Sequence, residues 1–218
     1  MDASITALVP TPRTPAEQEV RLSEDLFERF LGTTTAVHAA GLKSFGLLLA
    51  DPGTPGYPFV ATDVAFFDPR KNRRNDPAMR PAFEAQGTYF RAYDDAGFVA
   101  DSAELLDVYR RLDDSGLEAV AMFHVHRRQP ANFSFIDFRL HNPAYPWHLI
   151  LSLRDPAQPV MAAFGVWKDP TAELGISPED RNEGSEQTYP GPEVTQLRVV
   201  VDGRVDAVAG RSGRFARA

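Results

Sequence analysis

The sequence predicts a single α/β domain in which a mixed β-sheet is flanked by helices. Short apolar runs with the length of buried strands alternate with segments whose apolar residues recur at helical spacing. Hydrophobic residues make up 43% of the 218 residues, and the 15 phenylalanines among them can fill a substantial core. We expect the domain to span residues 21–210, with an N-terminal tail at 1–20 and a C-terminal tail at 211–218.

The first part of the domain is predicted to hold a long helix followed by two strands. Residues 22–40 have helical spacing, and Ser23 is a suitable N-cap because two acidic residues follow it. The apolar runs Phe45–Leu49 and Phe59–Phe67 are expected to be strands. The sequence DPGTPG between them is typical of a turn.

The next part is expected to be a loop, a strand and a helix. Asp68–Pro81 carries five basic residues among its 14. It is either a solvated loop or a binding site for an acidic partner or a substrate carboxylate. Thr88–Tyr93 (TYFRAY) is expected to be a strand, and Ser102–Ser115 is expected to be an amphipathic helix capped by Ser102.

The second half is predicted to be richer in strands. The run Leu117–His126 is apolar at nearly every position, which indicates a strand buried on both faces. An acidic, Pro/Gly-rich segment at 168–193 is expected to be a long loop or a linker. The remaining expected elements are a short helix at 134–140, strands at 147–153 and 160–166, and a hairpin at 196–208 that turns at Asp202-Gly203 and supplies the last strands of the sheet.

Polar residues that can bind a metal lie at the end of the predicted buried strand. His124 and His126 are two apart, so on a strand their side chains share one face. Ser134 and Asp137 are three apart, so on a short helix they share a face too. Two imidazoles, one carboxylate and an open position for water make a suitable catalytic zinc site.

Each of these residues also has a purely structural interpretation. A histidine at the end of a buried strand is often a hydrogen-bonded core residue, and Ser134-x-x-Asp137 resembles a helix capping box. The capping and metal-binding roles are compatible. His141 and His148 are either neighbours that support the ligands, substitute ligands, or packing residues.

The motif resembles a known family. His124-x-His126, seven residues and Ser134-x-x-Asp137 is similar to the HxH(x7)SxxD signature of the JAMM metallopeptidases, which have the MPN or Mov34 fold. The predicted strands before and after the motif match that cytidine-deaminase-like fold in order. The resemblance implies that His124, His126 and Asp137 ligate Zn²⁺ and that Ser134 stabilises the oxyanion.

The sequence departs from the family at two positions. Arg127 stands where the family usually has proline. Lys43 stands where the family has the glutamate that acts as general base, and there is no glutamate between Arg29 and Phe83. Three explanations are open. The base comes from Asp63 or Glu84; Lys43 points away and the site is weak or silent; or Lys43 serves a different zinc-assisted reaction as a charge stabiliser or proton carrier.

Composition narrows the functional class. The net charge of −7 argues against non-specific nucleic-acid binding, and no apolar run is long enough to span a membrane. The chain has no cysteine, so thiolate ligands and disulfides are excluded. The start of the sequence does not look like a signal peptide, so we expect a cytoplasmic protein. The oligomeric state is open, and a homodimer is one possibility.

The resemblance implies a zinc-dependent hydrolase that cleaves a peptide or isopeptide bond. The substrates of such proteins are often the C-terminal tails of ubiquitin-like or sulfur-carrier proteins. Two alternatives are open: a non-catalytic MPN-type binding module, and a zinc-dependent small-molecule hydrolase or lyase with a changed mechanism. Lys43 in place of glutamate favours the module, whereas the intact histidine and Ser-x-x-Asp motifs favour an enzyme.

Overall fold

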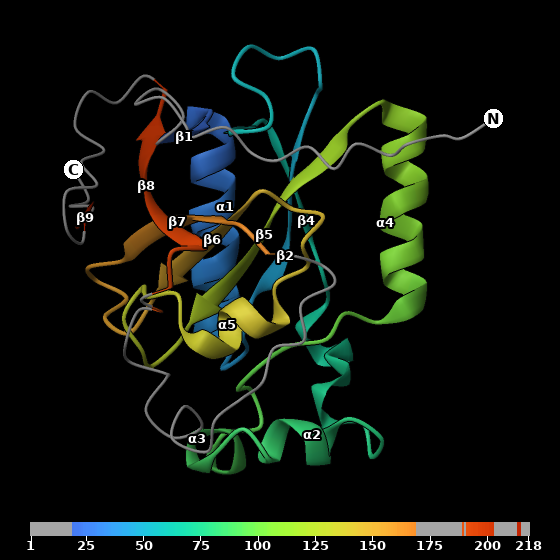
Figure 1. The fold of residues 1–218 in the computed structure, drawn as a ribbon, viewed down its shortest axis with the longest axis vertical. Helices are drawn as coiled ribbons and strands as arrows, with labels where there is room; N and C mark the ends of the chain where they lie inside the picture. The colour runs from blue at the N-terminus through green and yellow to red at the C-terminus, as the bar shows by residue number, and fades with distance from the viewer. Residues whose placement is uncertain (1–18, 169–188, 190, 203–212, 215–218) are drawn as a thin grey trace.

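The computed structural model describes residues 19–168, 189, 191–202 and 213–214 (Figure 1). The described residues form a sheet in the order β3-β1-β8-β7-β6-β5-β2-β4, with the short β9 paired to β7. The strands are β1 (Glu19–Leu22), β2 (Phe45–Ala50), β3 (Val60–Ala61), β4 (Asp63–Phe66), β5 (Glu118–His126), β6 (Trp147–Ser152), β7 (Val160–Val166), β8 (Val194–Val201) and β9 (Gly213–Arg214). The helices are α1 (Glu24–Ala39), α2 (Arg80–Glu84), α3 (Thr88–Ala92), α4 (Ser102–Ser115) and α5 (Phe135–Leu140), with 3-10 turns η2 (Pro69–Lys71) and η3 (Arg73–Asn75).

The sheet is mixed, as the sequence predicts. β5 runs parallel to β6, and β1 runs parallel to both of its neighbours, whereas the other pairs are antiparallel. Its two end strands, β3 and β4, are separated in the chain by Thr62 alone. The Thr62 amide donates to the Leu49 carbonyl of β2 at 2.8 Å, so the sheet is nearly closed on itself.

Helices cover the sheet from different sides (Figure 1). Alternate residues of β2 show this directly, because Leu48 packs in the core cluster that contains α1 and Leu47 packs in the cluster that contains α4. Side chains of successive strand residues point to opposite faces, so β2 is buried on both. The expected α/β architecture with flanking helices is therefore confirmed. No helix in the described part of the chain is both long and apolar enough to cross a membrane.

The helix caps were predicted correctly at one helix and wrongly at another. At α1 the Ser23 side chain accepts from the Leu26 amide at 3.2 Å, as expected. At α4 the N-cap is Asp101 and not Ser102, because the Asp101 carboxylate accepts from both the Ala103 and Glu104 amides. A carboxylate at this position also interacts favourably with the positive end of the helix dipole.

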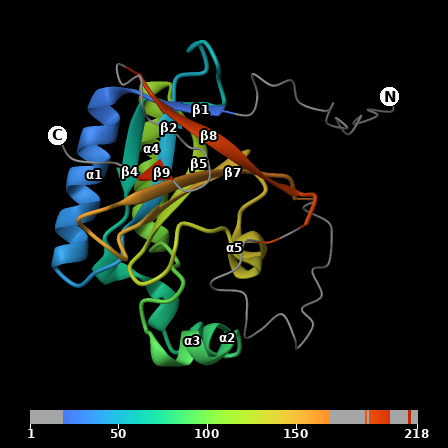
Figure 2. The ribbon, with the colours of Figure 1, turned by 90° about the vertical axis from the view of Figure 1, so that its left-hand side faces the viewer.

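The predicted strand at Thr88–Tyr93 is wrong, because this segment is helix α3. Phe90 packs with Phe83 of α2, with Ala96 and with Ile136 of α5 in a small separate cluster. Contacts of this kind override local strand propensity. Figure 2 shows α2 and α3 below the sheet. Residues 68–101, which lie between β4 and α4 and contain both helices, are called the insertion below.

Other predicted elements also differ. The expected strand at 59–67 is divided at Thr62 into β3 and β4. β8 lies between β1 and β7, inside the sheet, and is not a last strand. Residues 203–208 of the predicted hairpin and most of the acidic segment 168–193 lie outside the described residues, as do residues 1–18.

Candidate metal centre

The three predicted ligands meet at the end of β5. His124 and His126 project from the same face of the strand, and Asp137 projects from the first turn of α5. The two Nε2 atoms are 2.9 Å apart, and His124 Nε2 is 3.3 Å from Asp137 Oδ1. One ligand atom from each residue lies within 4.8 Å of the others. The cluster can therefore hold a metal ion.

Asp137 serves two purposes at the start of α5. Its Oδ2 accepts from the Ser134 amide at 2.8 Å and from the Ser134 hydroxyl at 2.6 Å. In return, the Asp137 amide donates to Ser134 Oγ, which completes the predicted capping box. Because the cap uses Oδ2, Oδ1 remains directed at His124. The capping box and the carboxylate of the cluster coexist.

His126 is held by the loop that follows β5. Its Nδ1 lies 2.6 Å from the Pro130 carbonyl, which can only accept, so we assign the ring proton to Nδ1. Nε2 then has a free lone pair. Burial lowers the pKa of His126 below its ordinary value, which favours this neutral form.

His124 is the first of three buried histidines in a row. Its Nδ1 is 2.8 Å from His148 Nε2, and His148 Nδ1 is 3.1 Å from His141 Nδ1. His141 Nε2 lies 2.8 Å from the Tyr145 carbonyl. His148 therefore contacts the cluster directly, and His141 contacts it only through His148. His38 on α1 contacts neither the cluster nor the cavity beside it in the described part of the chain.

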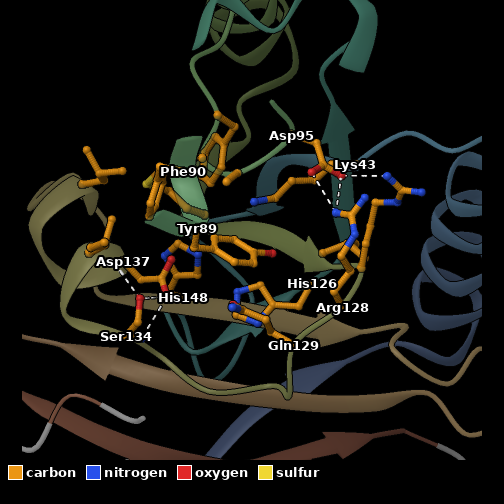
Figure 3. A pocket seen from close by; sticks show the side chains of 18 of the residues that line it. Lys43, Tyr89, Phe90, Asp95, His126, Arg128, Gln129, Ser134, Asp137 and His148 are labelled. Carbon is orange, nitrogen blue, oxygen red and sulfur yellow. Dashed lines mark hydrogen bonds and ion pairs between the residues drawn. The ribbon is translucent and has the colours of Figure 1, made fainter. Parts of the chain in front are cut away.

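A cavity of about 50 Å³ adjoins two of the three ligands, His126 and Asp137 (Figure 3). Figure 3 shows Lys43 and Asp95 on one side of the cavity and Ser134 and Asp137 on the other. The insertion supplies one wall through Tyr89, Phe90 and residues 95–98. The site is therefore enclosed by segments far apart in the sequence.

Lys43 faces this cavity, so the expectation that it points away is wrong. Its ammonium lies 5.5 Å from the centre of the Phe98 ring. Burial lowers the pKa of Lys43 to about 8, against the opposing attraction of Asp137 and Asp95. A partly deprotonated amine at mildly alkaline pH is thus present beside the cluster.

The carboxylates considered as substitute bases lie elsewhere. Asp63 pairs with Arg29 at 3.1 Å on the surface, and Glu84 is 4.0 Å from Arg80. Neither lines the cavity, so they are not placed to act there. Asp95 does line it, but its oxygens accept from Arg127 at 2.7 Å and from Arg128 at 2.9 Å.

Sequence reasoning missed Asp95 and Tyr89. The available signal was the pair of adjacent arginines, Arg127 and Arg128, which follow β5 directly and favour an acidic partner nearby. Arg128 also lies over the Tyr93 ring at 4.3 Å. Both contacts join the insertion to the strand that bears the histidines.

The donor set fits a divalent cation. Two imidazole nitrogens without a proton between them repel at 2.9 Å unless a cation lies beside both. Burial lowers the pKa of both histidines, which disfavours the doubly protonated, charged form of each ring. Two imidazoles and one carboxylate are a zinc donor set.

Comparison with known proteins supports the fold alone. No family model matches the chain, and no curated protein matches its sequence. A solved protein from Desulfitobacterium hafniense matches with a TM-score of 0.54 and 19% identity, covering 86% of this chain and 95% of that one. The chain shares the fold of that protein.

Two further solved structures are more distant neighbours. A protein from Salinibacter ruber has a TM-score of 0.42 and 18% identity, covering 78% of this chain and 100% of that chain. A JAB1/MPN domain protein from Archaeoglobus fulgidus has a TM-score of 0.37 and 12% identity, covering 67% of this chain and 88% of its own. These two are too remote in shape to carry a functional argument.

Proposed function

We propose that the protein is a zinc-dependent hydrolase of the JAMM/MPN type that cleaves a peptide or isopeptide bond. The observation that carries this proposal is the pair of facing Nε2 atoms, 2.9 Å apart and beside a carboxylate oxygen. His124, His126 and Asp137 would hold the zinc. When bound, zinc would lower the pKa of a coordinated water and polarise a substrate carbonyl.

The chain's own residues would bind and orient the substrate around that centre. Ser134 lines the cavity, but its hydroxyl donates to Asp137 Oδ2, so a role at the oxyanion requires this hydrogen bond to be exchanged. The Lys43 ammonium can stabilise negative charge in the cavity. As a neutral amine, Lys43 can instead accept a proton, which is the task of the missing glutamate.

The small volume of the site favours a substrate without bulky side chains. The cavity of about 50 Å³ admits a chain without bulky side chains, such as a glycine-rich tail. β4 has a strand neighbour on one side only in the described sheet. Phe67, which follows β4, packs on Phe45, and the Phe45 ring stacks on Phe98, which lines the cavity. An extended tail could pair with that edge. We propose the C-terminal tail of a ubiquitin-like or sulfur-carrier protein as the substrate.

A substitution at Lys43 tests this function. Lys43→Glu restores the family's base, so hydrolysis of a fluorogenic Gly-Gly isopeptide should rise by roughly tenfold or more, since general base assistance is typically worth 10²- to 10⁴-fold. Lys43→Met is the matched control, because it removes the charge without supplying a base. A Lys43→Glu protein that binds zinc and shows no gain would contradict the peptidase assignment.

A second candidate is a zinc-dependent hydrolase or lyase acting on small molecules. The cavity is small, and its three cationic side chains, Lys43, Arg127 and Arg128, outnumber its two carboxylates, Asp95 and Asp137. These features favour a small anionic substrate. A comparison of carrier-protein fusions with small carboxylated amides separates this candidate from a peptidase. A binding module without catalysis predicts no turnover of either.

A further inference from the structure

The hydrogen bonds that link His124, His148 and His141 have a fixed donor-to-acceptor direction. Resting on the proposed metal site, we propose that His148 and His141 are positioning residues that set the tautomer of His124 and so leave its Nε2 as the metal-binding atom. The Tyr145 carbonyl is the fixed end of this row. His141 and His148 also line the cavity, but the role proposed for them is exerted through the hydrogen bond to His124.

The direction follows from the hydrogen-bonding capacity of each group. The Tyr145 carbonyl only accepts, so His141 Nε2, at 2.8 Å, must donate to it. In a neutral ring the other nitrogen accepts, so His141 Nδ1 takes a hydrogen bond from His148 Nδ1 at 3.1 Å.

Because a neutral imidazole has one donor and one acceptor nitrogen, the proton of His124 can be assigned in the same way. His148 Nε2 is then an acceptor, and His124 Nδ1, at 2.8 Å, must donate to it. The proton of His124 is therefore on Nδ1, and its Nε2 presents a lone pair to His126 Nε2 and Asp137. A backbone carbonyl fixes His126 in the same tautomer, since Pro130 accepts from its Nδ1.

The surroundings keep the row dry and in place. His124, His141 and His148 are each at most 2% exposed, so water does not compete for their nitrogens. The Phe133 ring lies edge-on to both His148 and His141. Burial also lowers the pKa of His141 to about 4, which keeps that ring neutral at physiological pH.

The backbone of His141 is tied to the ligand-bearing helix. Its amide donates to the Asp137 carbonyl at 2.9 Å. Its carbonyl accepts from Lys168 Nζ at 3.0 Å, and the same ammonium donates to the Arg139 carbonyl. The row therefore joins the end of α5 to β6 and β5. Outer residues that orient ligating histidines typically contribute about 10- to 100-fold in metal affinity.

The test measures zinc affinity by chelator competition in three proteins: the native chain, His148→Phe and His148→Gln. We expect His148→Phe to weaken zinc binding by about 10- to 100-fold, because Phe cannot accept from His124 Nδ1. His148→Gln should lose much less, since an amide can accept from His124 and donate to His141. His38→Phe changes a histidine outside the row and should leave affinity unaltered.

The native chain gives a second readout that needs no variant. Long-range ¹H–¹⁵N NMR of the zinc-free protein reports the tautomer of each histidine, and we expect His124, His126 and His148 to carry the proton on Nδ1 and His141 on Nε2. A zinc-binding native chain with His124 protonated on Nε2, or a folded His148→Phe with native affinity, overturns this inference. A native chain that binds no zinc overturns the proposed function instead.

Discussion

The two walls of the cavity are built in different ways. The ligand wall comes from β5 and α5, in which His124 to Asp137 are close in sequence and are joined by local contacts such as the Ser134–Asp137 capping box. The insertion wall comes from residues 68–101, whose contacts cross long distances in sequence. Its Arg74 is 1% exposed and donates to the Phe90, Tyr93 and Ala96 carbonyls.

This difference explains which wall can be predicted from sequence. Strand spacing and a three-residue helical step suffice to bring the ligands of the first wall together. The second wall depends on one buried guanidinium and a small aromatic cluster, neither of which leaves a periodic pattern. The local sequence is thus sufficient to bring the three metal ligands together, whereas the wall that encloses them depends on contacts between residues further apart in the sequence.

The largest expected effect comes from removing one ligand of the first wall. Asp137→Asn keeps an oxygen that can accept from the Ser134 amide but removes the anionic donor, so zinc affinity should fall by about a thousandfold, roughly 4 kcal/mol. Equilibrium competition with a chelator measures this.

Ser134→Ala is the matched control. It removes the cap hydroxyl at a cost of about 1 kcal/mol in unfolding free energy and leaves all three ligands in place. If Asp137→Asn binds zinc as tightly as the native chain, Asp137 is not a zinc ligand.

The second effect is a fall in the free energy of unfolding at acid pH, which should arise from the histidines beside the ligand wall and not from the insertion. His141 has a pKa of about 4 when folded, chiefly through burial, against 6.5 ordinarily. Between these values the unfolded chain takes up a proton that the folded chain does not, so stability falls as pH is lowered through this window. The loss from this ring should be roughly 3 kcal/mol. Urea unfolding of the zinc-free protein at several pH values would measure it.

His141→Gln should reduce that acid-induced loss, because an amide can accept from His148 and donate to the Tyr145 carbonyl without titrating. The other buried histidines would still contribute to what remains. An equally steep decline in the variant would show that His141 is protonated in the folded state or is not buried as described.

The smallest effect in free energy should come from the insertion. Arg74→Met leaves three carbonyls without their guanidinium partner, which should cost roughly 2–3 kcal/mol. Amide hydrogen exchange within 68–101 should then accelerate, while zinc affinity stays within about threefold of native. Arg73→Met, on the same turn but bonded to Asp76 and the exposed Ser102, should change exchange much less. Loss of zinc binding in Arg74→Met would show that the two walls are not independent.

Much of the fold could be predicted from the sequence, since α1 with its Ser23 cap, the strands β2, β5, β6 and β7, and helix α5 lie where apolar spacing places them. The sequence misassigned α3 because TYFRAY has strand-like composition, and only its packing on Phe83 and Ile136 makes it a helix. The cap of α4 was missed by one residue because Asp and Ser are equally good caps.

The candidate site was predictable in its ligands but not in its surroundings. His141 and His148 were noticed as neighbours, yet their order follows from the packing of β6 beside β5, which no local pattern reveals. Asp95 reaches the cavity from the insertion, and its pairing with Arg127 and Arg128 depends on the tertiary structure. The sequence places Lys43 at the position of the family's glutamate, but only the structure shows that it faces the cavity.

The most direct test of the central claim is a calorimetric titration of the metal-free native chain with Zn²⁺, followed by elemental analysis of the dialysed protein. The account predicts saturable binding of one zinc per chain, weakened by about a thousandfold in Asp137→Asn. Absence of saturable binding in a folded native protein would contradict it.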